Sequence, residues 1–235
     1  MKAMILAAGL GTRLRPLTDT RPKALVEVAG RTLLEITLLR LRAFGIREVV
    51  INVHHFAEIV VEYLKANDNL GMRIEVSREE VLLDTGGGLK KAAWFFLENP
   101  TEEPFLLHNV DVISTIDFAR MLQVHNQSRA LATLAVQERS TSRYLLFDEQ
   151  NQLCGRRAEG KEEVVRSVQR LQALAFSGIH VISPRLLTMM TEDGVFSIIA
   201  SYLRLAGQGE KITGFRADEY EWRDVGRLED LRKLI

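Results

Sequence analysis

Short apolar runs alternate with segments of helical spacing along the first 136 residues of this chain. Such runs are typical of buried strands, and an apolar residue every three or four positions is typical of helices. The runs expected to form strands are residues 3–8, 48–53, 72–77, 104–112 and 130–136. The segments expected to form helices are residues 32–45, 56–68, 86–98 and 116–128, the first ending at Gly45. The alternation predicts an α/β fold with a mixed, mainly parallel sheet and helices on both of its faces.

The pattern changes after about residue 137. Residues 143–156 predict a hairpin with its turn at 148–152, and the charged residues 158–170 predict an exposed excursion. Further strands are expected over residues 171–183, 211–217 and 219–226, and helices over 196–207 and 227–235. We see no repeat or linker, so we expect one domain over residues 1–235 in which about 137–235 elaborates about 1–136.

The composition excludes several classes of protein. With 46% hydrophobic residues in 235, the chain can bury a full core. Lys and Arg total 31, as do Asp and Glu, so the zero net charge argues against a nucleic-acid partner. The single Cys154 cannot form an internal disulfide, and the apolar run Ala3 to Ala8 is too short for a signal peptide. No run approaches the roughly 20 apolar residues of a membrane span, so we expect a soluble, cytoplasmic protein without a membrane partner.

The loop after the first strand begins Gly9-Leu10-Gly11-Thr12-Arg13. A bare Gly-x-Gly is equally typical of an ordinary turn between a strand and a helix. A dinucleotide-binding fingerprint and a P-loop both require a further glycine at position 14, which is Leu14. The loop is therefore neither of these two phosphate-binding motifs.

Cations follow in the same loop, which is stiffened by proline. Arg13 and Arg15 precede Pro16, and Lys23 follows Pro22. A connection this long between a strand and a helix is unusual in a compact domain and is usually functional. The two sets of cations can face one anion from two sides, so the sequence predicts a phosphate clamp.

Two aspartates are candidate magnesium ligands. Asp111, in Asn109-Val110-Asp111, ends an apolar strand, and Asp224 precedes a predicted helix. Either could instead form an Asx turn or cap a helix. For Asp111 the position at the same sheet edge as the cationic loop favours a Mg²⁺ ligand, since this ion is held by one or two carboxylates. Asp224 would complete the site if the late strands return to the first sheet.

Three successive glycines follow Thr85, at residues 86–88. Glycine costs roughly 1 kcal/mol relative to alanine inside a helix. The run therefore favours a backbone that approaches a flat ligand such as a nucleobase, and close packing of helix against strand is the alternative. Serine-hydrolase chemistry is excluded at Ser177, because Ala175 stands where a nucleophile elbow needs glycine.

These residues lie within longer motifs that resemble a known family. The segments LAAGLGTRLRPLT (6–18) and RPKALVEVAGRTLLE (21–35) are similar to the signature of sugar-1-phosphate nucleotidyltransferases. The resemblance continues through DTGGGLKKA, NVDV, FSGIHVISP and WRDVG, over nearly the whole chain. It implies a Rossmann-like fold of the nucleotide-diphospho-sugar transferase type. The short chain looks most like the N-acetylmuramate 1-phosphate uridylyltransferases, with heptose and mannose guanylyltransferases as alternatives.

The resemblance implies a role for each matched residue. The parts of the chain that would hold the base and ribose are the backbone of Leu6 to Gly9, including Ala8, and the segment Thr85, Gly86 and Gly87. The residues that would hold the triphosphate are Gly11, Thr12 and Arg13, with Arg13 on the departing pyrophosphate. Lys23 would lie at the α-phosphate. Asp111 and Asp224 would bind Mg²⁺, and Asn109 and Gly178 would line the sugar side.

The implied reaction makes an NDP-sugar and pyrophosphate from a nucleoside triphosphate and a sugar 1-phosphate. Its catalytic residues would be Arg13, Lys23 and Asp111, its partners these small molecules, and its assembly a monomer or small homo-oligomer. Two features depart from the family pattern: Val110 replaces a glycine or another small residue, and no Glu-Lys-Pro motif occurs in residues 155–172. A non-catalytic nucleotide-binding homologue remains an alternative.

Overall fold

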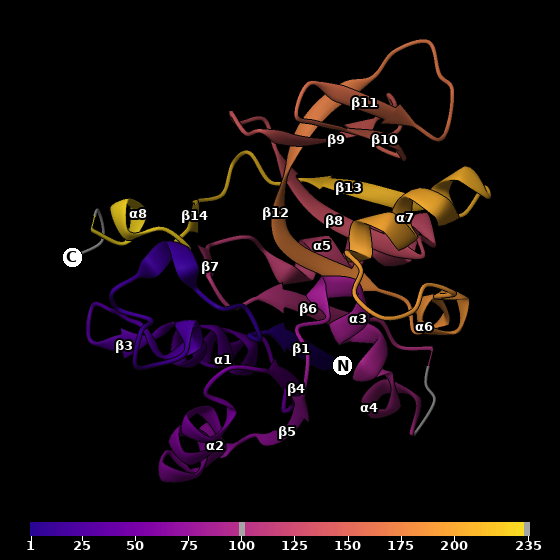
Figure 1. Cartoon of the computed structure of the whole chain (residues 1–235). Coiled ribbons are helices and arrows are strands. Elements are labelled where there is room, and N and C mark those ends of the chain that lie inside the picture. Colours follow the sequence, from indigo (N-terminus) through magenta and orange to yellow (C-terminus); the bar gives the residue numbers. More distant parts are fainter. Residues whose placement is uncertain (99–101, 233–235) are drawn as a thin grey trace.

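One mixed sheet runs through the centre of the molecule in the computed structural model, which describes residues 1–98 and 102–232 (Figure 1). Its strands are, in spatial order, β11 (Lys161–Val164), β10 (Leu153–Ala158), β9 (Arg143–Phe147), β12 (Gln172–Ile182), β6 (Phe105–Asn109), β1 (Lys2–Leu6), β4 (Glu48–Val53) and β5 (Arg73–Arg78). β6, β1, β4 and β5 are mutually parallel, as the alternation of strands and helices predicts. β8 (Ala132–Gln137) pairs antiparallel with β12, and β13 (Ile212–Arg216) pairs parallel with β8.

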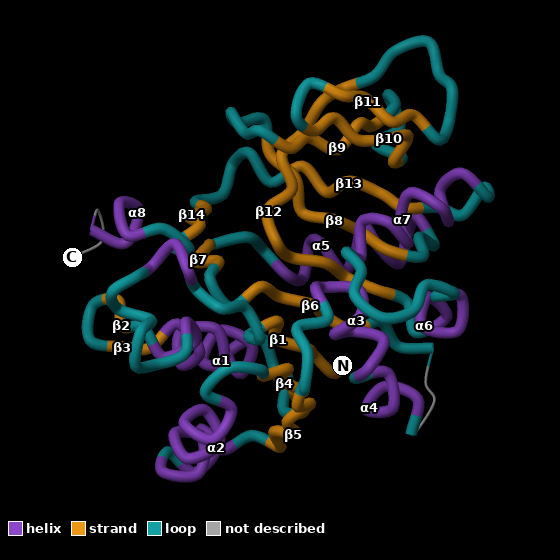
Figure 2. The backbone as a smooth tube through the Cα atoms, viewed as in Figure 1, coloured by secondary structure: helices purple, strands orange, loops and turns teal. Residues whose placement is uncertain are grey.

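Helices pack on both faces of this sheet, which confirms the predicted fold class (Figures 1 and 2). The helices that contribute to the core on one face are α1 (Leu33–Ala43), α2 (Ala57–Ala66) and α5 (Phe118–Ser128). Those on the other face are α3 (Asp84–Lys91), α4 (Ala93–Leu97), α6 (Arg185–Met189) and α7 (Ile198–Gly207). Within the described residues, no helix combines the length and the apolar character that a bilayer crossing requires.

Three predicted elements differ from the structure. The helix expected over 86–98 is two helices and begins at Asp84, so the glycines lie inside α3. The strand expected over 104–112 is β6 followed by β7 (Val112–Ser114). The strand expected over 219–226 is only β14 (Trp222–Asp224), which pairs antiparallel with β7 in a separate small sheet.

The remaining short elements lie in the connections. They are β2 (Glu27–Val28), β3 (Arg31–Thr32), α8 (Leu228–Arg232) and the 3₁₀ turns η1 (Thr12–Leu14), η2 (Lys23–Leu25) and η3 (Asp68–Gly71). The hairpin of β9 and β10 forms as predicted, and β11 extends it from within the expected excursion. Of the helix expected over 227–235, the structure describes α8 over Leu228–Arg232, and residues 233–235 lie outside the described part of the chain.

Gly45 ends α1 as predicted. Its φ of +97° is left-handed, its amide donates to the Arg42 carbonyl, and the Ile46 amide donates to the Leu41 carbonyl. This is the hydrogen-bond pattern of a Schellman motif. Apart from its chain neighbours, no heavy atom of the described residues lies within 4 Å of the place where a Cβ would stand, so substitution adds backbone strain without a clash.

Gly45→Ala should therefore lower the free energy of unfolding by about 1 kcal/mol, measured by urea denaturation, because alanine resists the left-handed conformation. Gly45→Asn should cost less, since asparagine tolerates that conformation. Gly207→Ala is a matched control, because Gly207 ends α7 without a left-handed φ, and it should cost nothing. Equal losses for Gly45→Ala and Gly207→Ala would contradict the strain explanation.

His125 joins α5 to the sheet. Its Nδ1 lies 2.9 Å from the Thr133 hydroxyl and its Nε2 lies 3.0 Å from the Ser183 hydroxyl. Burial lowers the pKa of this imidazole to about 4. The unfolded chain, with an ordinary histidine pKa near 6.5, therefore binds a proton that the folded protein does not.

Stability contributed by His125 is present above about pH 6.5 and is lost as the pH falls toward 4. Lowering the pH from 7 to 5 should lower the free energy of unfolding by about 2 kcal/mol through this histidine. We expect His125→Gln to show a correspondingly smaller loss over that interval in urea denaturation. An unchanged pH dependence in the variant would show that His125 does not titrate in this way.

Candidate active site

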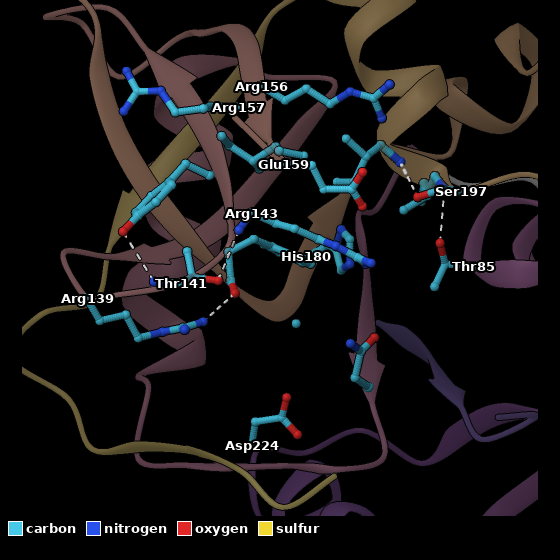
Figure 3. A pocket seen from close by; sticks show the side chains of 18 of the residues that line it. Thr85, Arg139, Thr141, Arg143, Arg156, Arg157, Glu159, His180, Ser197 and Asp224 are labelled. Carbon is cyan, nitrogen blue, oxygen red and sulfur yellow. Dashed lines mark hydrogen bonds between the residues drawn. The ribbon is translucent and has the colours of Figure 1, made fainter. Parts of the chain in front are cut away.

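Two cavities open at the edge of the sheet where the parallel strands end. The smaller, of about 410 Å³, includes Leu6, Ala8, Gly9 and Lys23 in its lining. The larger, of about 880 Å³, lies beside β9, β10 and β12 and includes Gly178 (Figure 3). Both are bounded by Asp84, Thr85, Asn109 and Asp111. The register places Leu6 beside Asn109 on β6 and Asn52 on β4, so the ends of three strands form one row.

The loop after β1 is folded back on itself. Gly11 has a left-handed φ of +65°, and the Thr18 hydroxyl donates to its carbonyl at 2.8 Å. A Cβ at Gly11 would lie 2.8 Å from the Thr18 methyl carbon, so this position requires glycine for space as well as conformation. Leu14 is fully buried in the core and fixes the turn that carries Thr12 and Arg13. Both of these residues are exposed.

Four charged residues from distant parts of the sequence meet between the cavities. The Lys23 ammonium pairs with Asp111 Oδ2. A Cβ placed on Gly226 would lie 2.7 Å from Asp224 Oδ1, 2.9 Å from Asp111 Oδ2 and 3.1 Å from Arg13 Nη2. Arg13, Asp111 and Asp224 therefore surround one point, and a side chain at position 226 would displace their charged ends.

The pairing of β14 with β7 is what brings Asp224 to Asp111. Asp224 lies opposite Val112 in that pairing, and the Val225 amide donates to the Asp111 carbonyl at 2.9 Å. Asp224 thus reaches Asp111 through the small sheet rather than through the main one. From the sequence we expected Asp224 to complete the magnesium site if the late strands return to the first sheet. β13 does return to that sheet, but β14, which carries Asp224, does not.

Two carboxylates and two cations share this point. Burial raises the pKa of the Asp224 carboxyl, the neighbouring Asp111 carboxylate raises it further, and the Gly226 amide, Lys23 and Arg13 oppose the rise. Two partly buried carboxylates at one point suit a hard divalent cation. Among the described residues, no group of three or more His, Cys, Asp or Glu could hold a metal ion by itself. A cation held by Asp111 and Asp224 would therefore need further ligands that are not His, Cys, Asp or Glu side chains of the described residues.

The glycine run has a packing reason in the structure. A Cβ on Gly86 would overlap the Phe196 ring, and one on Gly87 would overlap the Gly194 carbonyl oxygen. The amides of Gly86 and Gly87 both donate to the Phe196 carbonyl. Neither residue lines either cavity, whereas Thr85 lines both. The packing alternative thus accounts for these two glycines.

Gly178 lies at an irregularity of β12. Its φ is +75°, and the pairing of β12 with β8 shifts register between Phe176 and His180. A Cβ here would lie 2.9 Å from Asn109 Nδ2, so Gly178 and Asn109 form one wall of the larger cavity.

Val110, which departs from the family pattern, is buried in the core, and its amide donates to the Leu6 carbonyl at 3.1 Å.

Two buried polar residues that the sequence analysis missed support the smaller cavity. Asn52 Oδ1 accepts from the Ala7 amide at 2.7 Å, and Asn52 Nδ2 donates to Glu79 Oε1 at 2.7 Å. Glu79 Oε2 accepts from the Leu83 amide at 2.9 Å. This chain of bonds ties the end of β1 to the segment before α3. The only signal in the sequence was one asparagine within an apolar strand.

Comparison with known proteins agrees with this geometry. The chain matches the family model described as nucleotidyl transferase over residues 2–235. It is 36% identical over 233 residues to N-acetylmuramate alpha-1-phosphate uridylyltransferase of Caulobacter vibrioides, covering 95% of this chain and 91% of the relative. It is 31% identical over 234 residues to mannose-1-phosphate guanyltransferase of Yarrowia lipolytica, covering 98% of this chain and 62% of the relative.

The fold recurs in solved structures. A putative glucose-1-phosphate thymidylyltransferase from Bacillus anthracis superimposes with a TM-score of 0.81 at 17% identity, covering 100% of this chain and 93% of the other. At that identity the likeness concerns the fold alone. The resemblance inferred from the motifs and the predicted fold type are both confirmed.

Proposed function

This chain belongs to the nucleotidyl transferase family, and we propose that it makes a UDP-sugar and pyrophosphate from UTP and N-acetylmuramate 1-phosphate. The observation that carries the proposal is the meeting of Arg13, Lys23, Asp111 and Asp224 between two cavities. The relative that is 36% identical over nearly the whole chain supports this choice of nucleotide and sugar.

In the proposed arrangement the smaller cavity holds the nucleotide. Leu6, Ala8 and Gly9 offer backbone to a base and ribose, and Thr85 closes the opposite wall. Gly11, Thr12 and Arg13 face the triphosphate, while Gly86 and Gly87 act indirectly by allowing α3 to pack closely. The larger cavity, with Asn109 and Gly178, receives the sugar.

The proposed reaction is a single displacement. A phosphate oxygen of the sugar 1-phosphate attacks the α-phosphorus of the nucleoside triphosphate, and a new P–O bond forms. The bond from the α-phosphorus to the bridging oxygen breaks, and pyrophosphate leaves with that electron pair. The attacking phosphate is already anionic near neutral pH, so no general base is needed. Lys23 lowers the repulsion at the α-phosphate, and Arg13 stabilises the charge that develops on pyrophosphate.

Asp111 and Asp224 fit a divalent cation, which we propose is Mg²⁺. Their oxygens lie around one point, and burial together with the neighbouring Asp111 carboxylate raises the pKa of Asp224. The ion would supply Lewis-acid stabilisation of the phosphate oxygens. In the structure, the Lys23 ammonium supplies positive charge beside Asp111 by pairing with its carboxylate. We expect the ammonium to exchange Asp111 for the α-phosphate when the nucleotide binds.

A pyrophosphate-release screen tests the proposal. UTP, dTTP, GTP, CTP and ATP are each combined with the 1-phosphates of N-acetylmuramate, glucose, mannose and heptose. We expect the fastest release from UTP with N-acetylmuramate 1-phosphate. Fastest release from GTP with mannose 1-phosphate would favour the second candidate, the guanylyltransferase suggested by the Yarrowia relative. No release from any pair would favour a non-catalytic nucleotide-binding protein.

A further inference from the structure

Arg139 lies at the boundary of the larger cavity. It follows β8, and its Nη2 donates to the Phe176 carbonyl at 2.7 Å. Its Nε is buried and has no hydrogen-bond partner among the residues that the structure describes. In the described part of the chain no carboxylate lies within salt-bridge distance of it. Figure 3 shows the side chain extending into the cavity above Asp224.

An aromatic ring fixes the position of this guanidinium. The Cζ atom of Arg139 lies 3.7 Å from the ring centroid of Trp222, and the Trp222 indole donates to the Ser177 carbonyl at 2.8 Å. Trp222 stands in β14, two residues before Asp224. A stacked guanidinium is held rigidly enough to present its free N–H groups to an anion in one direction.

Arg139 also borders the region of Arg13. A third cavity, of about 660 Å³, is lined by four arginines and two aspartates, and we call it the basic cavity: Arg13, Arg139, Arg223, Arg227, Asp224 and Asp230. Burial lowers the pKa of Arg139, and the Asp224 carboxylate raises it. A phosphate dianion in the cavity would add negative charge beside this guanidinium.

The other cations around the larger cavity are less suited to that role. Arg156 pairs with Glu163 and Arg157 pairs with Glu162, so their charges are already satisfied. Arg143 and Lys161 have no ion pair among the described residues, and both line the larger cavity but not the basic one. Of these five cations, Arg139 alone lines both cavities, as Asp224 does.

We propose that Arg139, stacked on Trp222, binds the phosphate of the incoming sugar 1-phosphate and so positions the attacking oxygen. Lys23 and Arg13 then serve the nucleoside triphosphate, and Arg139 serves the nucleophile in the larger cavity. This inference rests on the proposed function. The contact is a charge-assisted hydrogen bond to a phosphate that every sugar 1-phosphate shares.

Steady-state kinetics of Arg139→Gln test the role, with the pair of substrates that gives the fastest pyrophosphate release in the wild-type protein. We expect KM for the sugar 1-phosphate to rise at least about tenfold, while KM for the nucleotide changes less than about twofold. Arg139→Lys, which keeps the charge without the planar fork, should give an intermediate rise. Arg216→Gln is the matched control, because Arg216 pairs with Asp218 and Glu138 and lines neither cavity.

A binding measurement separates this inference from the proposed function. Calorimetric titration of N-acetylmuramate 1-phosphate should show weaker binding to Arg139→Gln than to wild type, with no turnover required. An unchanged KM and affinity would overturn the role of Arg139, as would an equal rise in KM for the nucleotide. A larger effect of Arg143→Gln on the sugar 1-phosphate would assign the contact to Arg143 instead. Failure of the proposed function has a different result: no wild-type pyrophosphate release with any pair.

Discussion

Lys23→Ala should lower turnover by at least about a hundredfold, the scale expected when a preorganised electrostatic stabiliser is lost. The Lys23 side chain is only 12% exposed, and its ammonium lies against Asp111 at the point shared by the two cavities. A triphosphate that approaches this point meets two carboxylates, and removing the ammonium adds their repulsion to that of the attacking phosphate. The measurement is kcat for pyrophosphate release at saturating substrates.

The control for Lys23→Ala is Arg21→Ala. Arg21 is an exposed cation in the same loop, and its loss should leave turnover near the wild-type value. Thermal denaturation of both variants checks that they are folded, because Lys23→Ala also leaves Asp111 without its partner. Near-normal turnover in folded Lys23→Ala would refute the assignment of Lys23 to the reacting phosphate.

Asp111→Asn should have a loss of similar size, at least about a hundredfold in turnover. Asparagine keeps the shape of the side chain and removes its charge, so the variant isolates the electrostatic contribution. Asp224→Asn should behave in the same way, because both carboxylates surround one point. In each variant the Mg²⁺ concentration that gives half-maximal rate should rise, and EDTA should abolish release by the wild-type protein.

Asp68→Asn makes the same chemical change at an exposed position in η3, remote from the cavities, and should leave turnover unaffected. The double variant Asp111→Asn/Asp224→Asn should lose less than the product of the single losses, because the two groups act as one unit. If the losses multiply, the aspartates act independently and the shared cation site is wrong. Full activity in EDTA would exclude a divalent cation from the reaction.

The parallel part of the sheet was predictable because its signals are local. Each of its strands is a short apolar run, and parallel strands end at one edge. The loop after β1 and Asn109 at the end of β6 were therefore expected to be neighbours, and the register confirms this. The turn at Gly45 was predictable for the same reason, since a single residue determines it.

Residues whose importance depends on a distant partner were less predictable. In the sequence, Asn52 and Glu79 look like ordinary polar residues. In the structure they are hydrogen-bonded to each other, and each also accepts from the backbone of a different loop. Arg139 follows β8 at a strand end, yet nothing in its sequence neighbourhood indicates Trp222 as its partner. The glycines of α3 suggested a ligand, because a sequence does not show that Phe196 and Gly194 occupy the space beside them.

The sequence by itself determined the α/β class, the cationic loop and the family, because these follow from local spacing and contiguous motifs. The tertiary structure alone decided how Asp224 reaches Asp111. That approach depends on three residues of β14 pairing with β7, outside the main sheet, and on Gly226 leaving space for Arg13. Pairings between segments more than a hundred residues apart carry no periodic signal, because their energy comes from contacts that exist only after the chain has folded.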